Sequence, residues 1–121
     1  MHRTLAVAFA FCFSASAGLA EGFVPVQDRD RFLDLVEGRE LRLGLFGVRL
    51  NVTADGRIDG QAIAAEVTGH WYWQDGYFCR EMDWSGQPIP YNCQLVEVRD
   101  TSELRFTVDR GAGQSATFRL R

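Results

Sequence analysis

The residue types that could do chemistry are concentrated in one stretch, residues 69–84, with the sequence GHWYWQDGYFCREMDW. This stretch holds the only histidine other than His2, an arginine set among aromatic residues, and a cysteine. An imidazole beside a carboxylate can transfer protons, an arginine can bind an anion, and a cysteine can form a disulfide or bind a metal. Which of these uses applies depends on the elements that position the groups.

Asp75-Gly76 is a strong signal for a two-residue β-hairpin turn. Pairing around this turn would place Trp71 opposite Arg80 and His70 opposite Glu81. Side chains alternate between the two faces of a strand. One face, the core face by composition, then carries Trp71, Trp73, Phe78, Arg80 and Met82, and the other carries His70, Tyr72, Gln74, Tyr77, Cys79 and Glu81.

Arg80 would be a charged side chain on a core face, and such a group needs partners. We expect it to close one end of a barrel by stacking on Trp71, a cation–π contact worth about 1–2 kcal/mol, and by donating to backbone carbonyls. The functional alternative is that Arg80 anchors an anionic ligand inside the barrel.

His70 and Glu81 would form a cross-strand ion pair on the outer face, worth less than about 1 kcal/mol. A Ser–His or Cys–His nucleophile would have to use His70, yet no serine lies in a nucleophile-elbow pattern. The chain contains no lysine, which excludes Schiff-base chemistry and pyridoxal phosphate attachment. We therefore predict no catalytic residue, no metal site and no cofactor.

Cys79 and Cys93 are expected to form a structural disulfide. Cys93 precedes an alternating run, 94–98, that places it on the outer face together with Cys79. A metal or redox pair is the alternative, but the spacing is long and there is no second cysteine pair. The bridge would tie down residues 85–91, where Pro88 and Pro90 indicate a stiff surface loop.

Residues 1–20 have the organisation of a secretory signal peptide: Arg3, an apolar run over 5–13, and small residues before a cleavage point after Ala20, with Ala17 as a second candidate. The apolar run is too short to span a bilayer. An uncleaved, buried N-terminal helix is the alternative. We expect a mature single domain, residues 21–121, that is periplasmic or secreted and has no stable membrane anchor.

The mature chain is predicted to be all-β after one short helix over 29–37, which Asp28 would cap and Gly38 would end. Period-two alternation then indicates seven or eight strands in an antiparallel meander or barrel. Twelve arginines against sixteen acidic residues give the mature chain a net charge of −4. The scattered arginines do not form a basic face for nucleic acid.

The leader, with GFVPV, FLDLV, DGRIDG, GHWYWQDGYFCR, NCQ and LRFTVDRGAG, resembles a group of small exported alphaproteobacterial proteins over nearly the whole mature chain. Members of that group are often labelled dihydrodipicolinate reductase, but such an enzyme needs a nicotinamide-binding unit with a glycine-rich turn, which this sequence lacks. Gly69-His70-Trp71 is also similar to the G-x-W of lipocalin-like barrels, although theirs opens the first strand.

Two binding functions stay open, beside an enzyme or a purely structural envelope component. A non-catalytic binding or inhibitor module would contact an envelope protein through the exposed aromatic region of Tyr77, Trp84, Ile89 and Tyr91. A small-ligand carrier would instead use the barrel interior, with Arg80 beside Trp71 as the anion anchor.

Overall fold

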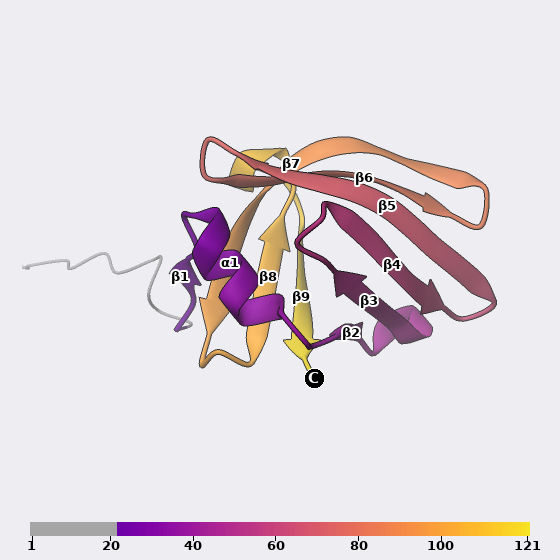
Figure 1. Cartoon of the computed structure of the whole chain (residues 1–121), viewed down its shortest axis with the longest axis horizontal. Helices are drawn as coiled ribbons and strands as arrows, with labels where there is room; N and C mark the ends of the chain where they lie inside the picture. Colours follow the sequence, from indigo (N-terminus) through magenta and orange to yellow (C-terminus); the bar gives the residue numbers. More distant parts are fainter. Residues whose placement is uncertain (1–21) are drawn as a thin grey trace, which may run out of the picture.

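The computed structural model describes residues 22–121 (Figure 1). The predicted signal peptide therefore lies outside the described residues. In chain order the elements are β1 (Val24–Pro25), α1 (Arg29–Val36), β2 (Leu41–Leu43), the 3-10 helix η1 (Leu45–Gly47), β3 (Val48–Val52), β4 (Arg57–Ala62), β5 (Ala65–Gln74), β6 (Tyr77–Trp84), β7 (Gln87–Arg99), β8 (Glu103–Thr107), the 3-10 helix η2 (Asp109–Gly111) and β9 (Ser115–Leu120). Across these residues, no helix has the length and apolar character needed to cross a membrane.

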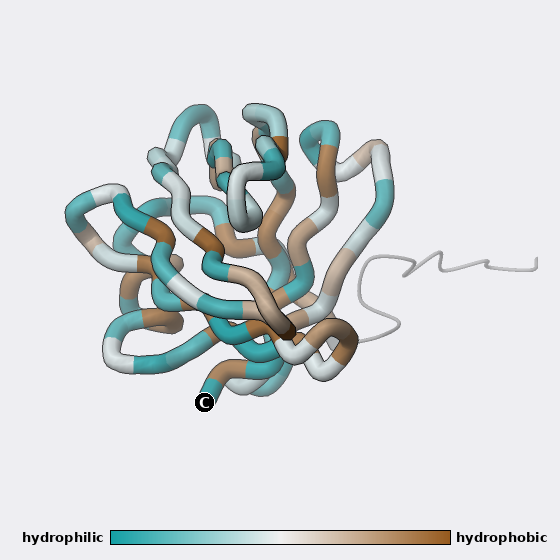
Figure 2. Tube along the Cα trace, turned by 90° about the vertical axis from the view of Figure 1, so that its right-hand side faces the viewer, coloured by the Kyte–Doolittle hydropathy of each residue, from teal (hydrophilic) through white to brown (hydrophobic). Residues whose placement is uncertain are grey.

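The sheet closes on itself. Each strand from β2 to β8 pairs antiparallel with the next strand of the chain, and β9 returns to pair with β2. Hydrophobic and hydrophilic residues alternate along the strands (Figure 2), as in β3, where every second residue is buried. The predicted antiparallel barrel is therefore confirmed with eight strands, and the short strand β1 is added beside β7.

Two glycines lie where neighbouring strands leave no room for a side chain. A Cβ atom on Gly60 would lie 2.0 Å from the carbonyl oxygen of Arg49, and one on Gly69 would lie 2.5 Å from that of Glu81. No side chain fits at such distances, so both positions require glycine. This gives a physical role to the first residue of the Gly69-His70-Trp71 motif.

Helix α1 closes one end of the barrel. Asp28 caps it by accepting a hydrogen bond from the backbone N–H of Arg31. Phe32, which has no exposed surface, inserts among aromatic side chains of the barrel. Its ring centroid lies 5.1–6.4 Å from those of Trp71, Trp73, Phe78 and Phe106.

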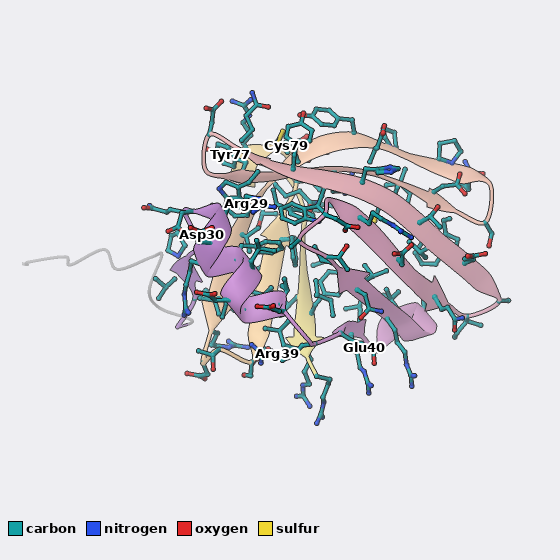
Figure 3. The ribbon with its side chains drawn as sticks, viewed as in Figure 1. Arg29, Asp30, Arg39, Glu40, Tyr77 and Cys79 are labelled. Carbon is teal, nitrogen blue, oxygen red and sulfur yellow. A yellow bond between two sulfur atoms is a disulfide. The ribbon has the colours of Figure 1, made fainter. Side chains whose placement is uncertain are left out.

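Arg29 fixes the helix to the sheet from outside. It extends from α1 toward the barrel (Figure 3) and donates to the carbonyl oxygen of Ala54 at 2.7 Å. The predicted helix is confirmed, one residue shorter at its C-terminal end.

The prediction of a surface loop over residues 85–91 is wrong. Ser85 and Gly86 form a tight turn with φ of 47° and 91°, and β7 begins directly afterwards at Gln87. Arg80 pairs with Asn92 and Met82 with Ile89, so two residues of β7 lie opposite one residue of β6. In the described chain, this half of β7 pairs with β6 alone. Proline is tolerated in strands at edges and at bulges, which explains how β7 accommodates Pro88 and Pro90.

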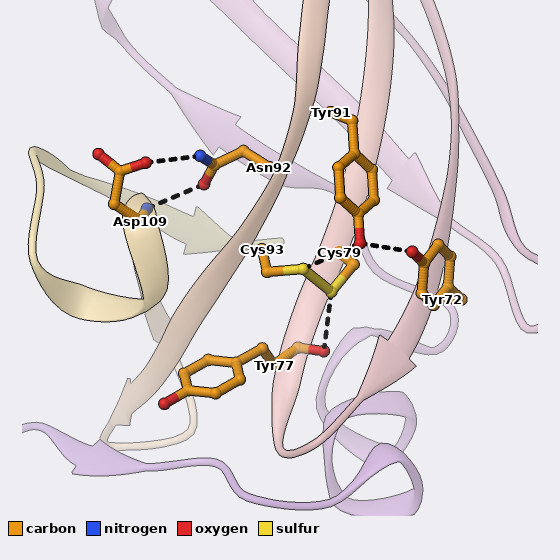
Figure 4. The surroundings of a disulfide bond; sticks show 7 residues. All are labelled: Tyr72, Tyr77, Cys79, Tyr91, Asn92, Cys93 and Asp109. Carbon is orange, nitrogen blue, oxygen red and sulfur yellow. Dashed lines mark hydrogen bonds between the residues drawn. A yellow bond between two sulfur atoms is a disulfide. The ribbon is translucent and has the colours of Figure 1, made fainter.

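The predicted disulfide is confirmed. Cys79 and Cys93 lie directly opposite each other on β6 and β7, and their sulfur atoms are bonded (Figure 4). Cys79 is fully buried, although it lies on the outer face of the strand. The bridge therefore joins two adjacent strands. It lies just before the part of β7 that pairs with β8.

Removing the disulfide should destabilise the fold. Replacing both cysteines, Cys79→Ser with Cys93→Ser, should lower the free energy of unfolding by about 2–5 kcal/mol, the usual cost for a small domain. Urea denaturation measures this. Reductant should destabilise the natural protein by a similar amount and leave the double variant unchanged; equal stability of the natural protein in both conditions would contradict the prediction.

Phe32→Ala should also be strongly destabilising, because it leaves a cavity among four aromatic rings. We expect a loss of about 3–5 kcal/mol in the free energy of unfolding by urea denaturation. Asp34→Ala, an exposed position on the same helix, is the matched control and should change stability by less than about 0.5 kcal/mol. Similar losses of unfolding free energy in both variants would show that the packing of Phe32 does not stabilise the closed end of the barrel.

Candidate functional site

The register of the β5–β6 hairpin is the one predicted from Asp75-Gly76. Trp71 pairs with Arg80, and His70 pairs with Glu81. Asp75 and Gly76 have φ of 53° and 84°, the conformation that this turn requires. The hairpin therefore directs Arg80 into the barrel and His70 to the outside, as expected.

The barrel interior is not completely filled. A cavity of about 300 Å³ remains beyond the aromatic cluster around Phe32. Its wall is mainly apolar, and polar side chains reach it at few points. The lining residues are Leu41, Leu50, Val52, Ile58, Phe78, Arg80, Met82, Gln94, Phe106, Val108, Gln114, Ser115, Ala116 and Phe118. A small set of polar groups in an apolar hollow is typical of small-molecule sites.

Arg80 is the only charged side chain on the wall of this cavity. It is 8% exposed, and its Nη1 donates to the carbonyl oxygen of Pro90 at 2.7 Å. Pro90 lies in the β-bulge of β7, which explains how its carbonyl faces a side chain inside the barrel. Burial lowers the pKa of the Arg80 guanidinium from its ordinary value. Arginine nevertheless stays charged at neutral pH.

No carboxylate neutralises Arg80. Within residues 22–121, the ion pairs involve other arginines: Arg42, Arg57, Arg99 and Arg105. Of its five N–H groups, Arg80 uses one in a hydrogen bond to a described residue. The wall of the cavity therefore carries a largely buried positive charge that has donors left for a further partner.

The expectation that Arg80 stacks on Trp71 is not met. The cation over the Trp71 ring is Arg29, at 5.4 Å from the ring centroid. Phe78 stacks on the same ring at 5.5 Å, and Phe32 meets it edge-on. The Trp71 indole N–H donates to the carbonyl oxygen of Thr53 at 2.9 Å. Trp71 is therefore part of the packing at the closed end of the barrel. The other half of the expectation, donation to a backbone carbonyl, is confirmed.

Gln94 is a polar residue of the site that was not singled out from the sequence. It is 7% exposed, lies on the cavity wall, and pairs in register with Phe78. Its side-chain amide forms no hydrogen bond within residues 22–121, and it is not among the fully buried unpaired polar groups, so solvent can reach it. The signal was present, since Gln94 shares the inward parity of Val96 and Val98 in the alternating run.

Three other candidate residues, Tyr77, Trp84 and Tyr91, do not form one surface. Tyr77 and Trp84 lie at opposite ends of β6. Arg110 covers Tyr77 at 5.4 Å from the ring centroid. Trp84 pairs with buried Val67 and is only partly exposed. The aromatic region predicted as a single partner surface is thus divided.

Tyr91 is half-exposed and pairs with a residue that the sequence did not single out, Tyr72. Their rings stack with centroids 6.0 Å apart, and their hydroxyl groups are hydrogen-bonded. The Tyr91 hydroxyl also lies 3.1 Å from Sγ of Cys93 (Figure 4). Hydrogen bonding to Tyr91 raises the pKa of the Tyr72 hydroxyl above its ordinary value. This tyrosine pair covers the disulfide on the outer face.

His70 is exposed on the wall of a shallow depression that also includes Arg57, Asp59, Glu81 and Asp83. No ion pair joins His70 to Glu81 among the described residues, although the two are register partners. Within the same residues, no cluster of three or more His, Cys, Asp or Glu side chains could hold a metal ion.

Comparison of the chain with protein-family models, with curated proteins and with solved structures finds no match in any of the three.

Proposed function

We propose that this protein is a non-catalytic binding protein that holds a small molecule, an apolar body with one anionic group, inside its barrel. The observation that carries the proposal is the buried guanidinium of Arg80, which lines the cavity without a carboxylate partner. Removing a charge from water costs several kcal/mol unless it is paired and hydrogen-bonded. A carboxylate or phosphate bound at Arg80 would supply the missing partner through charge-assisted hydrogen bonds.

The rest of the cavity supports the same ligand class. Its volume of about 300 Å³ is at the lower limit for small-molecule sites. The amide of Gln94 can add a second hydrogen bond beside Arg80, and the apolar wall favours a hydrocarbon body. We place this function in the periplasm or outside the cell, because the chain has a signal-peptide pattern and a disulfide.

Octanoate and octanol provide the test, because they share a body and differ in the charge of the head group. The protein should bind octanoate more tightly in isothermal titration calorimetry. Arg80→Gln should weaken octanoate binding by about ten- to a hundredfold, the loss of one or two hydrogen bonds to a charged group, and leave octanol binding unchanged. Arg31→Gln, at an exposed arginine on α1, is the matched control.

The same variant should not unfold the protein, since it removes a desolvated charge along with one hydrogen bond. We expect its free energy of unfolding to change by less than about 1 kcal/mol. Equal octanoate affinity in Arg80→Gln and the natural protein would refute the anion-anchor role.

A second candidate is an inhibitor or adaptor that contacts an envelope protein. The half-exposed tyrosine pair Tyr72–Tyr91 favours it, because exposed tyrosines are enriched at interfaces. Native mass spectrometry of the protein isolated from its own compartment tests this role. A protein complex that is lost in Tyr91→Ala but kept in Arg80→Gln would support it, and a complex that survives both changes would count against it.

A further inference from the structure

Three arginines lie side by side on the outer face of the barrel. Arg42 on β2 pairs in register with Arg49 on β3 on one side and with Arg119 on β9 on the other. Cross-strand neighbours have Cα atoms about 4.5–5.5 Å apart, so three positive charges share a short row. Like charges directly opposite each other destabilise a sheet. We call Arg42, Arg49 and Arg119 the arginine row.

The carboxylates near the arginine row neutralise only part of its charge. Glu40 pairs with Arg42 at 3.1 Å. Glu103 is the register partner of Arg119, but its carboxylate is paired with Arg99 at 2.9 Å. Arg49 and Arg119 are exposed. The row therefore presents net positive charge to solvent on a protein whose mature chain is acidic overall.

An exposed apolar tip adjoins the arginine row. The η1 segment between β2 and β3 exposes Leu45 by 66% and Phe46 by 60%, and the β4–β5 turn exposes Ile63 by 74%. These three are the most exposed large hydrophobic residues of the described chain. The two loops are joined, because the Ile63 N–H donates to the carbonyl oxygen of Phe46 at 2.9 Å.

The backbone holds the tip in an unfavourable conformation. Phe46 has a φ of 63°, a left-handed conformation that a bulky residue rarely adopts. Gly47 has a φ of 58°, and a Cβ atom there would lie 3.1 Å from Ile63. The three apolar side chains of the tip are exposed to solvent, although burial of apolar surface is favourable.

We infer that this tip and the arginine row form a docking surface for an anionic phospholipid bilayer. Apolar side chains that enter the headgroup region beside basic residues that bind lipid phosphates are the features of reversible membrane-surface binding. Arg49 is on the strand that leaves η1, and its exposed side chain can reach headgroups while the tip inserts. Figure 3 shows nitrogen-tipped side chains projecting below the region of β2, where Glu40 is labelled.

A bilayer fits this surface better than a protein partner. The tip is formed by three side chains on two protruding loops, which is little beside the roughly 800 Å² per partner of a stable protein interface. Guanidinium groups bind phosphate through paired hydrogen bonds. The inference does not depend on a ligand in the barrel, since the surface lies on the outer face.

Vesicle co-sedimentation tests the inference. The protein is purified after export, and all variants carry the same N-terminus, verified by mass spectrometry. Vesicles contain equal parts of phosphatidylethanolamine and phosphatidylglycerol, with pure phosphatidylcholine as the uncharged comparison. We expect binding to the anionic vesicles that weakens with added salt, and much weaker binding to phosphatidylcholine.

Arg49→Gln with Arg119→Gln should weaken binding to the anionic vesicles by about tenfold or more, because each substitution removes the attraction of one basic residue to the anionic surface. Leu45→Ser with Ile63→Ser should also weaken it. Arg31→Gln with Arg57→Gln removes the same charge from exposed positions elsewhere and should retain binding. Arg80→Gln should retain it too, which separates this surface from the ligand proposed inside the barrel.

Phe46→Trp adds a direct measure of insertion: its fluorescence emission should shift to shorter wavelength with anionic vesicles. Absence of vesicle binding by the natural protein would overturn the inference. Equal binding by Arg49→Gln with Arg119→Gln would also overturn it. So would a dimer of the natural protein in analytical ultracentrifugation that Leu45→Ser with Ile63→Ser converts to a monomer.

Discussion

The insertion of Phe32 between the aromatic residues of β5, β6 and β8 determines how the interior of this barrel is used. An eight-stranded barrel is just wide enough to be filled by side chains or to hold one small molecule. In this barrel, side chains fill one end and a cavity remains at the other. The helix supplies the filling where Trp71 and Phe78 face inward, and the space toward Phe118 and Met82 stays open. Arg80 lies on the wall of this open space.

The β-bulge in β7 contributes to the cavity at the end that Phe32 does not fill. By placing an extra residue opposite β6, it turns the Pro90 carbonyl toward Arg80 and gives the guanidinium one fixed partner. One partner orients the side chain but leaves most of its donors unused. The same strand carries Gln94 two residues beyond Asn92, the register partner of Arg80, so β6 and β7 together supply two of the polar groups on the cavity wall.

Local signals were sufficient for much of this structure. The Asp75-Gly76 turn predicted the register of its hairpin, and alternation then predicted the inward Arg80 and the outward cysteines that are bonded across β6 and β7. Contacts between distant segments were not predictable in this way. Arg29 reaches Trp71 because of how α1 packs, and Pro88 and Pro90 fit a strand because of a bulge. The arginine row depends on β9 pairing with β2, which no local pattern encodes.

The two prolines of β7 have a consequence for how copies of the protein meet. In the described chain, the first half of β7 pairs with β6 and leaves its other side without a neighbouring strand. An open strand side normally offers a ladder of donors and acceptors on which another molecule can grow a sheet. Proline has no N–H to offer, so Pro88 and Pro90 interrupt that ladder where closure is incomplete. The residues that fit the bulge thereby also act against edge-to-edge aggregation at high concentration.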